Sequence, residues 1–370
     1  PRRDIVGIEN RNFRCLGSLD LNLESARSLL FIGKNGSGKS TIRKVLTLLQ
    51  ALGRGQNRVG ELISREDIPW GHSPEIPTRL ELQLSLQGQK ILYSLAFELP
   101  ARFHEHRICQ ERLIANGVEI YNREVAQVQL QRSGAASSRF SVDWHTVALN
   151  VIQDSGDISD PLKLLKHWLK TLVCLAPLPS RITGESKRAN LMPEASGENL
   201  GEWVTGLLTQ YPASYTELDR YVRSVLPDFE ALTNPESGRD THAMEVKFRG
   251  LSQSVPFAQL SDGEKCQILC GVLLAAGKAY GPILCFWDEP ESHIGLDNLS
   301  EMMSELRNHF QGQLWATSHS PRAIESFPTD SVYYLEKKSI LESASLRPIS
   351  EMDYGKSLVT ALARGELDGL

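Results

Sequence analysis

The chain has 370 residues, of which 41% are hydrophobic and 23% charged, a composition typical of a globular protein with one large domain or two lobes. Its formal net charge of -5 excludes an overall basic field that would draw the whole chain onto nucleic acid, although a local basic groove stays open. No apolar run approaches the ~20 residues that a membrane-spanning helix needs. We therefore expect no membrane partner, no signal peptide and a cytoplasmic location.

The six cysteines are Cys15, Cys109, Cys174, Cys266, Cys270 and Cys285. They form no CxxC pair, which argues against a zinc site or a disulfide framework and favours a reducing compartment. Two of them, Cys266 and Cys270, lie in an apolar run and are predicted to be small core residues.

The N-terminal third begins with short predicted strands at residues 4–8, 19–23 and 28–33. The last is a continuous apolar run, as in a buried parallel strand. It leads directly into a glycine-rich loop at residues 33–41, and a helical pattern follows that ends near Gly53.

Residues 78–100 predict a hairpin that turns at Gly88, and residues 118–131 predict further strands of the same antiparallel flank. Between residues 160 and 230 the apolar period becomes helical, which indicates three helices. Residues 177–195 are polar and interrupted by prolines, so we predict a mobile loop there.

The final third returns to alternating strands and helices. Apolar runs at residues 282–287, 313–317 and 331–335 each follow or precede a helical segment, as in a parallel α/β sheet.

The glycine-rich loop matches the phosphate-loop pattern, with Gly33, Gly38, Lys39 and Ser40 at the required spacing. Its glycines let successive backbone N–H groups curl around phosphate oxygens, and the following helix adds its positive dipole end. Lys39 would reach the β- and γ-phosphates of ATP, and the Ser40 hydroxyl would ligate Mg²⁺. The residues that we assign to nucleotide binding here are Asn35, Gly36, Ser37, Gly38, Lys39, Ser40 and Thr41.

The run at 283–287 ends in Asp288 and Glu289, two adjacent carboxylates at the carboxyl edge of a predicted strand. Asp288 would hold Mg²⁺, and Glu289 would orient or deprotonate the attacking water. The same residues, followed by Pro290, also suit a helix N-terminus. The phosphate loop favours the first interpretation, because a nucleotide bound there needs a carboxylate that holds its Mg²⁺.

Ser261 precedes an apolar helix, and Glu264 completes a capping box with it. The sequence at 260–264 also resembles the signature motif of ABC ATPases, in which a serine and a glycine face the γ-phosphate held by the other subunit. That resemblance assigns Ser261 and Gly263 to a nucleotide bound by a second copy. Asp262 departs from the glycine usual at its position and places a negative charge near that phosphate.

His319 follows the run at 313–317, at the position of the ABC switch histidine, which senses the γ-phosphate and the attacking water. A Ser-His-Asp hydrolase built with Ser318 and Asp288 lacks a nucleophile elbow and leaves the phosphate loop unexplained. Residues 104–106, His-Glu-His, offer too few ligands for a metal and are predicted to be a solvated loop.

These motifs, in this order, resemble the RecF/SMC/OLD-like branch of ABC-type ATPases. The sequences at residues 8–14, 197–200, 288–293 and 317–321 are also typical of that branch. The resemblance makes Arg14 a candidate for contacting phosphate or base, with an ordinary surface arginine as the alternative. The sequence departs from that branch in two ways that affect the expected dimer interface. The glutamine that normally links the nucleotide to the helical lobe cannot be placed, and Gly295-Leu296 stands where the branch often has a His-Pro pair after the acidic motif.

The resemblance implies an α/β fold: an ABC ATPase head with a mixed sheet around the phosphate loop, an antiparallel β flank and an inserted helical lobe. We expect an N-terminal part of the core at 1–155, the lobe at 156–255 and a C-terminal part of the core at 256–370. The segment after His319 is too short for a Toprim nuclease, so nuclease chemistry would belong to a partner.

The expected activity is ATP hydrolysis by Glu289, His319 and Lys39 in a head-to-tail homodimer or higher oligomer, with Mg²⁺. ATP-driven dimerisation would control a separate nuclease or toxin effector in anti-phage defence. The alternatives are a DNA-repair ATPase, for which DNA is the candidate partner, and a slow-turnover scaffold that sequesters a toxin or nuclease.

Overall fold

The computed structural model describes residues 3–14, 16–22, 27–67, 76–131, 136–337, 339, 342–352 and 358–364. The chain forms two compact units. The first consists of Pro1–Ala26, Gly33–Leu172 and Tyr333–Met352, and the second of Arg27–Ile32, Val173–Val332 and Asp353–Leu370. Each unit thus collects segments that are distant in sequence, whereas the three-part division at 155 and 255 stays a prediction.

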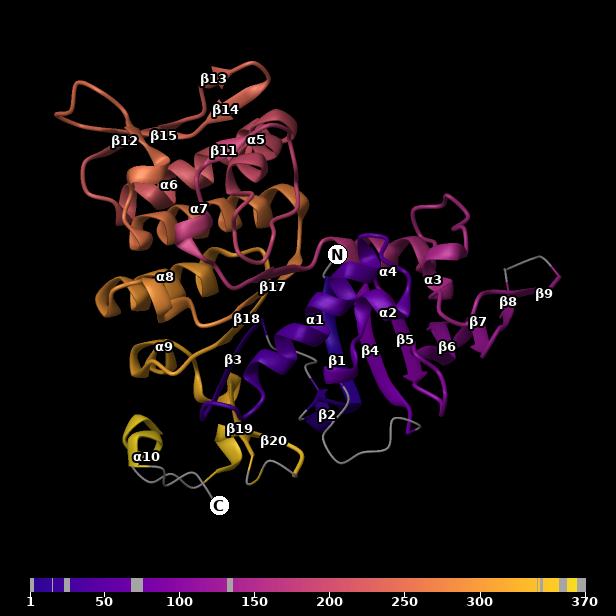
Figure 1. Ribbon diagram of the computed structural model, residues 1–370. Helices are drawn as coiled ribbons and strands as arrows, with labels where there is room; N and C mark the ends of the chain where they lie inside the picture. Colours follow the sequence, from indigo (N-terminus) through magenta and orange to yellow (C-terminus); the bar gives the residue numbers. More distant parts are fainter. Residues whose placement is uncertain are drawn as a thin grey trace. The chain divides into compact units, whose positions relative to one another are not determined.

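The first unit is built on an antiparallel sheet with the strand order β2-β1-β4-β5-β6-β7-β8-β9 (Figure 1). Its strands are β1 (Arg3–Phe13), β2 (Leu16–Asn22), β4 (Thr78–Leu86), β5 (Gln89–Glu98), β6 (Arg107–Ala115), β7 (Val118–Glu124), β8 (Gln127–Leu130) and β9 (Ser138–Ser141). The predicted hairpin is confirmed as β4 and β5, in register from Thr78 opposite Phe97 to Leu86 opposite Gln89. Alternate leucines of β4 are buried, which is the period-2 pattern of a sheet with one covered face.

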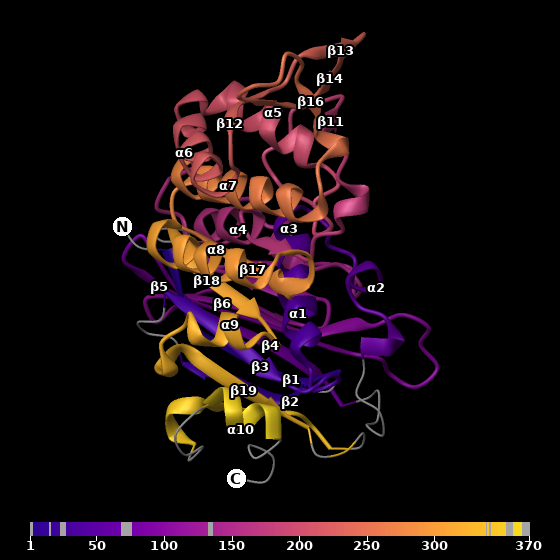
Figure 2. The ribbon, with the colours of Figure 1, turned by 90° about the vertical axis from the view of Figure 1, so that its left-hand side faces the viewer.

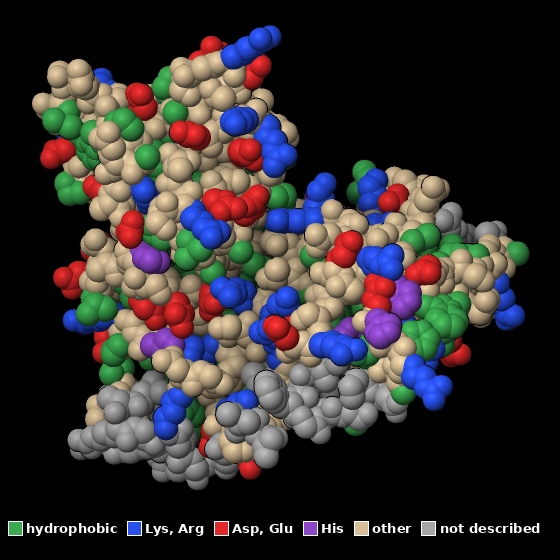
Figure 3. Space-filling model, viewed as in Figure 1, with side chains coloured by type: hydrophobic (Ala, Val, Ile, Leu, Met, Phe, Trp, Pro, Cys, Tyr) green, Lys and Arg blue, Asp and Glu red, His purple; other side chains and the backbone are tan. Residues whose placement is uncertain are grey.

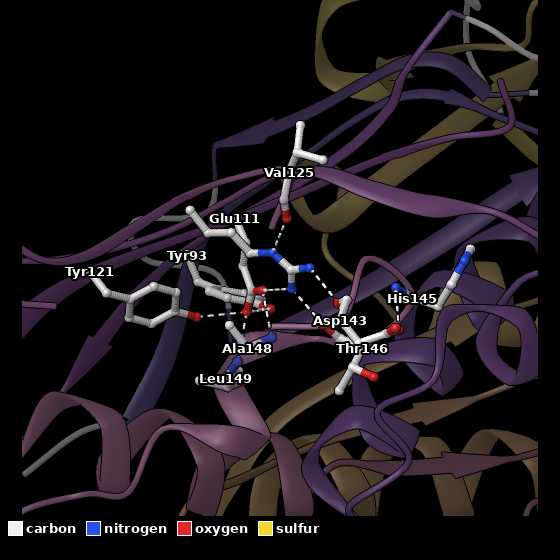
Figure 4. A network of polar contacts seen from close by, with 10 residues as sticks. Tyr93, Glu111, Tyr121, Val125, Asp143, His145, Thr146, Ala148 and Leu149 are labelled. Carbon is white, nitrogen blue, oxygen red and sulfur yellow. Dashed lines mark hydrogen bonds and ion pairs between the residues drawn. The ribbon is translucent and has the colours of Figure 1, made fainter. Parts of the chain in front are cut away.

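The sequence did not predict strand β6, because a charged residue occupies one of its inward positions. Ile108, Leu113 and Glu111 are all buried, and a register shift opposite Ala96 and Phe97 puts Ile108 out of phase with the other two. Oε1 of Glu111 accepts hydrogen bonds from Tyr121 at 2.8 Å and Tyr93 at 3.2 Å (Figure 4). The buried carboxylate and the register shift together interrupt the hydrophobic alternation that marks a strand.

The same carboxylate holds the first turn of helix α3 (Ala148–Val151), whose Ala148 and Leu149 N–H groups lie 2.7 and 2.8 Å from it. Arg123, also fully buried, lies 3.5 Å from Glu111 and donates to the carbonyls of Val125 at 2.7 Å and Asp143 at 2.8 Å. Each group in this network has a charged or polar partner, which is the condition for burying a charge at low cost. Burial and the nearby carboxylate raise the pKa of both tyrosines well above the ordinary value.

The remaining elements of this unit are the helices α1 (Lys39–Gly53), α2 (Val59–Leu62) and α4 (Pro161–Lys170), the 3-10 turns at Arg65–Asp67 and Ile349–Glu351, and the antiparallel pair β19 (Val332–Glu336) and β20 (Ser345–Pro348). Helix α1 carries the apolar face predicted after the glycine-rich loop and ends at the expected residue. It packs against α4 so closely that a Cβ on Gly53 would come within 2.2 Å of the Lys170 nitrogen.

The second unit contains a parallel sheet with the order β10-β17-β18-β3. Its strands are β10 (Val173–Leu175), β17 (Ile283–Trp287), β18 (Gly312–Thr317) and β3 (Ser28–Gly33). The buried apolar runs predicted for 28–33, 282–287 and 313–317 are confirmed as β3, β17 and β18. Helices α7 (Asp262–Tyr280) and α8 (Leu296–His309) lie side by side in both views (Figures 1 and 2), and α9 (Pro321–Glu325) and α10 (Leu358–Arg364) follow.

The helical lobe packs onto α7 within this unit. It contains α5 (Leu200–Gln210) and α6 (Tyr215–Val225), both of which the helical period predicted. Helix α6 approaches α7 at Gly271, where a Cβ would lie 2.8 Å from a methyl group of Leu218. The small antiparallel sheets around it are β11 (Glu185–Ser186) with β14 (Thr241–Ala243) and β13 (Glu236–Gly238), and β12 (Phe229–Thr233) with β15 (Glu245–Phe248) and β16 (Val255–Pro256).

These observations confirm an α/β fold with an antiparallel flank, a sheet of parallel strands and a helical lobe. The predicted loop at 177–195 contains a 3-10 turn (Pro179–Arg181) and strand β11, which pairs with β14. Among the described cysteines none is in a disulfide, and Cys266 and Cys270 are buried as predicted; Cys15 lies outside the described residues. In the part of the chain that the structure describes, no helix has the length and apolar character to cross a bilayer.

The prediction of a solvated loop at 104–106 is wrong for one of its residues. His104 is exposed, but the side chain of His106 is only 4% exposed and its ring meets Phe97 edge to face. Glu105 forms an ion pair with Arg58 at 2.8 Å. No group of three or more potential metal ligands occurs among the described residues, here or elsewhere.

Candidate functional site

The phosphate loop lies in the first unit, between the end of β3 and the start of α1. Lys34, Asn35 and Gly36 form its exposed tip, and the following Ser37, Gly38 and Lys39 are buried. Gly38 is the N-cap of α1 with φ 113, a left-handed conformation that suits glycine. The first turn of α1 has neither an acidic residue nor a side-chain hydrogen bond to its cap, so its N–H groups have the character of an anion-binding site.

The side chains of the loop complete this arrangement. Nζ of Lys39 lies 2.8 Å from the Gly33 carbonyl and 3.1 Å from the Lys34 carbonyl, so the ammonium is folded over its own loop. Ser40 is exposed at the first turn of α1, whereas the neighbouring Thr41 is buried. The hydroxyl of Ser37 is buried and has no hydrogen-bond partner in the described structure. The loop therefore fits a triphosphate: it offers backbone N–H groups, an ammonium and a hydroxyl.

Arg14 lies in the turn between β1 and β2, with φ 51. Its Nε donates to Oδ1 of Asp67 at 2.7 Å, and its backbone N–H donates to the Asp67 carbonyl at 2.8 Å. The Asp67 side chain is fully buried and also lies 4.0 Å from Lys44 of α1. Arg14 is thus held by a buried carboxylate, which the sequence did not indicate; its contact with phosphate or base stays a prediction.

In the second unit, Asp288 and Glu289 follow β17, and Ser318 and His319 follow the adjacent parallel strand β18. Because the register pairs Trp287 with Ala316, the ends of both strands meet at one edge of the sheet. Nε2 of His319 lies 3.0 Å from Oε1 of Glu289. The structure therefore brings together three of the predicted site residues: Asp288, Glu289 and His319.

The helix-capping interpretation of Asp288–Glu289 is partly realised. A 3-10 turn, η5 (Pro290–His293), begins immediately after Glu289, which is its N-cap residue. However, the Glu289 side chain makes no capping bond, and its backbone has φ 47. A non-glycine residue in this left-handed region is uncommon and frequently marks a functional position.

Two residues of this edge were missed by the sequence prediction. The buried hydroxyl of Thr317 donates to Oδ1 of Asp288 at 2.6 Å. Oε1 of Glu291 accepts from the Ser318 hydroxyl at 2.8 Å and from the His319 N–H at 2.7 Å. Both belong to segments that the sequence singled out, but only the pairing of β17 with β18 shows what they contact.

Ser261 and Gly263 lie at the start of α7, and the predicted capping box is confirmed. The Ser261 hydroxyl donates to Oε2 of Glu264 at 2.7 Å, and the Glu264 N–H donates back at 3.4 Å. Gly263 faces η5, since a Cβ there would lie 3.3 Å from the His293 carbonyl oxygen. Asp262 is 60% exposed, 4.0 Å from the His293 ring, so its carboxylate can point to solvent.

The cysteine next to this motif is not a candidate nucleophile. Burial raises the pKa of the Cys266 thiol to about 12, so the reactive thiolate is scarce near neutral pH.

No protein-family model matches the chain, and no curated protein matches its sequence. Solved structures with similar folds include an Smc head bound to the C-winged helix domain of ScpA, with 12% identity and a TM-score of 0.55 over 94% of this chain and 99% of that one. The SMC head domain from Thermotoga maritima has 14% identity and a TM-score of 0.50 over the same shares. The Smc head domain from Pyrococcus furiosus, bound to the C-terminal domain of ScpA, has 12% identity and a TM-score of 0.56 over 94% and 97%. At these identities the similarity concerns the fold alone: this chain has the fold of SMC head domains, the head fold that its motifs predicted.

Proposed function

We propose that the chain is an ABC-type ATPase that binds ATP with Mg²⁺ and hydrolyses it. The observation that carries this proposal is the contact between Glu289 and His319 beside Asp288, at the carboxyl edge of β17 and β18. A carboxylate held by a histidine can orient a water molecule and accept its proton, and a second carboxylate at the same sheet edge can hold Mg²⁺.

Chain connectivity supports a shared role for the phosphate loop and these residues. Strand β3 runs parallel to β18, with Phe31 opposite Thr317, and the Ser318 N–H donates to the Phe31 carbonyl at 3.1 Å. The loop begins two residues later, at Gly33, and consecutive Cα atoms are about 3.8 Å apart. We therefore propose that Lys39 and Ser40 serve the nucleotide whose hydrolysis Glu289 and His319 catalyse.

The proposed chemistry divides the work among these residues. The loop N–H groups and Lys39 bind the phosphates and stabilise the charge that develops on them. Ser40 and Asp288 would hold Mg²⁺, which neutralises charge on the β- and γ-phosphates. Glu289 orients the attacking water and accepts its proton, and His319 holds the Glu289 carboxylate in place.

We further propose that two copies share each nucleotide, with Ser261 and Gly263 of one facing the phosphate loop of the other. The support is the resemblance of residues 260–264 to the ABC signature motif, together with their place at the N-terminus of α7. Asp262 and Glu264 lie in the same first turn. The Ser261 hydroxyl now donates to Glu264, so it would have to turn away from that carboxylate to reach a phosphate. ATP binding would then select the closed dimer.

The partner is proposed to be a separate effector, a nuclease or toxin, in anti-phage defence. The Smc heads of similar fold are bound to domains of another protein, ScpA, which supports the idea that such a head works on a partner. On the face shown in Figure 3, Lys and Arg side chains are interspersed with Asp and Glu, which does not favour broad DNA binding on that face. DNA repair and a slow scaffold are the alternatives.

The test is turnover of the purified protein with Mg²⁺ and ATP, with and without DNA. Lys39→Ala should abolish ATP binding, and Glu289→Gln should slow hydrolysis at least about 100-fold, as for loss of a general base, and stabilise an ATP-bound dimer. Lys247→Ala, an exposed lysine paired with Glu230, is the matched control and should behave as the wild type. Unchanged ATP affinity in Lys39→Ala would refute the phosphate site.

If the wild-type protein binds ATP but does not hydrolyse it, the scaffold function is favoured. If DNA stimulates ATP hydrolysis, the DNA-repair function is favoured. A Glu289→Gln variant with normal hydrolysis and no ATP-bound dimer would refute the assignment of Glu289.

A further inference from the structure

Thr317, the last residue of β18, has a hydroxyl that makes two hydrogen bonds to the acidic end of β17. The hydroxyl donates to Oδ1 of Asp288 at 2.6 Å. It also accepts from the backbone N–H of Glu289 at 3.0 Å. The Thr317 side chain is completely buried, so water does not compete for either bond. One oxygen atom thus contacts both carboxylate residues that we assign to ATP hydrolysis.

The chemistry of the hydroxyl explains why this position suits threonine. A hydroxyl has one donor and two acceptor lone pairs, so it can serve a carboxylate and an N–H group together. Valine has the same shape without either function, and serine keeps both functions with less volume. The parallel register of β17 and β18 brings the residue after Ala316 beside the residue after Trp287, so the match follows from strand pairing.

The bond to the Glu289 N–H has a particular consequence for the backbone. Glu289 has φ 47, in the left-handed region that non-glycine residues rarely adopt. This conformation turns the chain from the end of β17 into η5. The hydrogen bond that this N–H donates to the buried Thr317 hydroxyl stabilises the unusual conformation and thereby directs the Glu289 side chain.

We propose that Thr317 is a positioning residue for ATP hydrolysis. Its hydroxyl orients the Asp288 carboxylate for the metal and holds the Glu289 backbone in the conformation from which its side chain acts. Thr317 touches neither nucleotide nor water in this scheme; it acts through its two neighbours. This role rests on the proposed ATPase function, and Thr317 is not among the residues assigned to that function above.

The experiment compares Thr317→Val with Thr317→Ser in steady-state ATP hydrolysis at varied Mg²⁺. Thr317→Val should lower kcat by about 10- to 100-fold, the range expected for losing a hydrogen bond to a charged group. In a binding titration without turnover, it should also raise the Mg²⁺ concentration that half-saturates Mg²⁺-dependent binding of a non-hydrolysable ATP analogue, because Asp288 is no longer oriented. Thr317→Ser should restore most of kcat and the normal Mg²⁺ dependence.

Thr171→Val is the matched control for losing a buried threonine hydroxyl. Thr171 is 5% exposed, and its hydroxyl bonds the His167 and Trp168 carbonyls of α4, the helix that it caps. This variant should keep the wild-type kcat and Mg²⁺ dependence. An equal loss in Thr171→Val would show that any buried hydroxyl matters in this way and would overturn the proposal.

The outcomes separate this proposal from the ATPase function itself. A wild-type protein without hydrolysis overturns the proposed function and the role of Thr317 with it. Active wild type together with an unchanged Thr317→Val variant overturns only the positioning role. If Thr317→Val does not fold, Thr317→Cys replaces it, because a thiol is a poor donor and acceptor; kcat equal to that of Thr317→Ser would then refute the proposal.

Discussion

His319 and Glu289, which follow adjacent parallel strands, form a direct contact of 3.0 Å between Nε2 and Oε1. Both side chains are partly exposed, at 37% and 44%, so the pair lies at the surface of its unit rather than in the core. An exposed ion pair contributes little to stability. The contact therefore acts through orientation, because the imidazole holds Oε1 of the carboxylate in place.

His319→Ala should consequently lower kcat for ATP hydrolysis by about 10- to 100-fold with little change in thermal stability, since a positioned polar partner is lost at an exposed site. Steady-state kinetics and a melting curve measure the two effects. His309→Ala is the control, because His309 is an exposed histidine of α8 that lies 3.8 Å from Glu305. A large fall in melting temperature with unchanged kcat would show a structural role instead.

Glu291 holds the segment that carries His319, because one oxygen accepts both the Ser318 hydroxyl and the His319 N–H. Glu291→Ala should lower kcat by roughly 10-fold, corresponding to the loss of bonds to a charged acceptor. ATP affinity should stay normal, since the phosphate loop is untouched. Glu291→Gln keeps an amide oxygen as acceptor, so its kcat should lie between those of the wild type and Glu291→Ala.

Nucleotide titrations and initial rates check this prediction, with exposed Glu325→Ala as the control. If Glu291→Ala weakened ATP binding and left kcat unchanged, the anchoring role would be wrong.

Glu111 should be the residue of the antiparallel sheet most sensitive to substitution. Glu111→Ala removes the acceptor of Tyr93 and Tyr121 and leaves the buried Arg123 without its carboxylate. Breaking a buried pair in this way costs about 3–5 kcal/mol in the free energy of unfolding. Urea denaturation followed by circular dichroism measures the change.

Glu119→Ala removes the partner of Arg112, 2.7 Å away on the exposed part of the same sheet. An exposed pair contributes about 0–1 kcal/mol, so this control should unfold almost as the wild type does. Equal midpoints for the two variants would contradict the importance of the buried network.

His106 should make the stability of the protein depend on pH below neutrality. Burial lowers the pKa of His106 from its ordinary 6.5, so the folded chain binds this proton more weakly than the unfolded chain. Stability is therefore lost as the pH falls below 6.5 towards the folded-state pKa, and the group has no effect at higher pH.

His106→Gln should flatten the decrease in the urea midpoint between about pH 7.5 and 5.5, a window that contains the ordinary histidine pKa. His104→Gln, at an exposed neighbouring position, should leave the decrease as in the wild type. The same slope in all three proteins would exclude His106 as its source.

The sequence by itself determined the phosphate loop, the strands β3, β17 and β18 that precede the main motifs, the β4–β5 hairpin and the capping box at Ser261. These features are local: a glycine pattern, an apolar run or a cap is encoded by residues within a few positions of one another. The acidic end of β17 and the histidine after β18 were identified for the same reason.

Only the tertiary structure decided which residues surround them. Strand β6 escaped prediction because its inward Glu111 finds partners on β5, β7 and α3, none of which its own sequence reveals. Thr317 and Glu291 became visible as partners of Asp288 and His319 only through the pairing of β17 with β18. Hydrogen bonds between residues distant in sequence depend on strand order and register, and a local pattern carries no information about either.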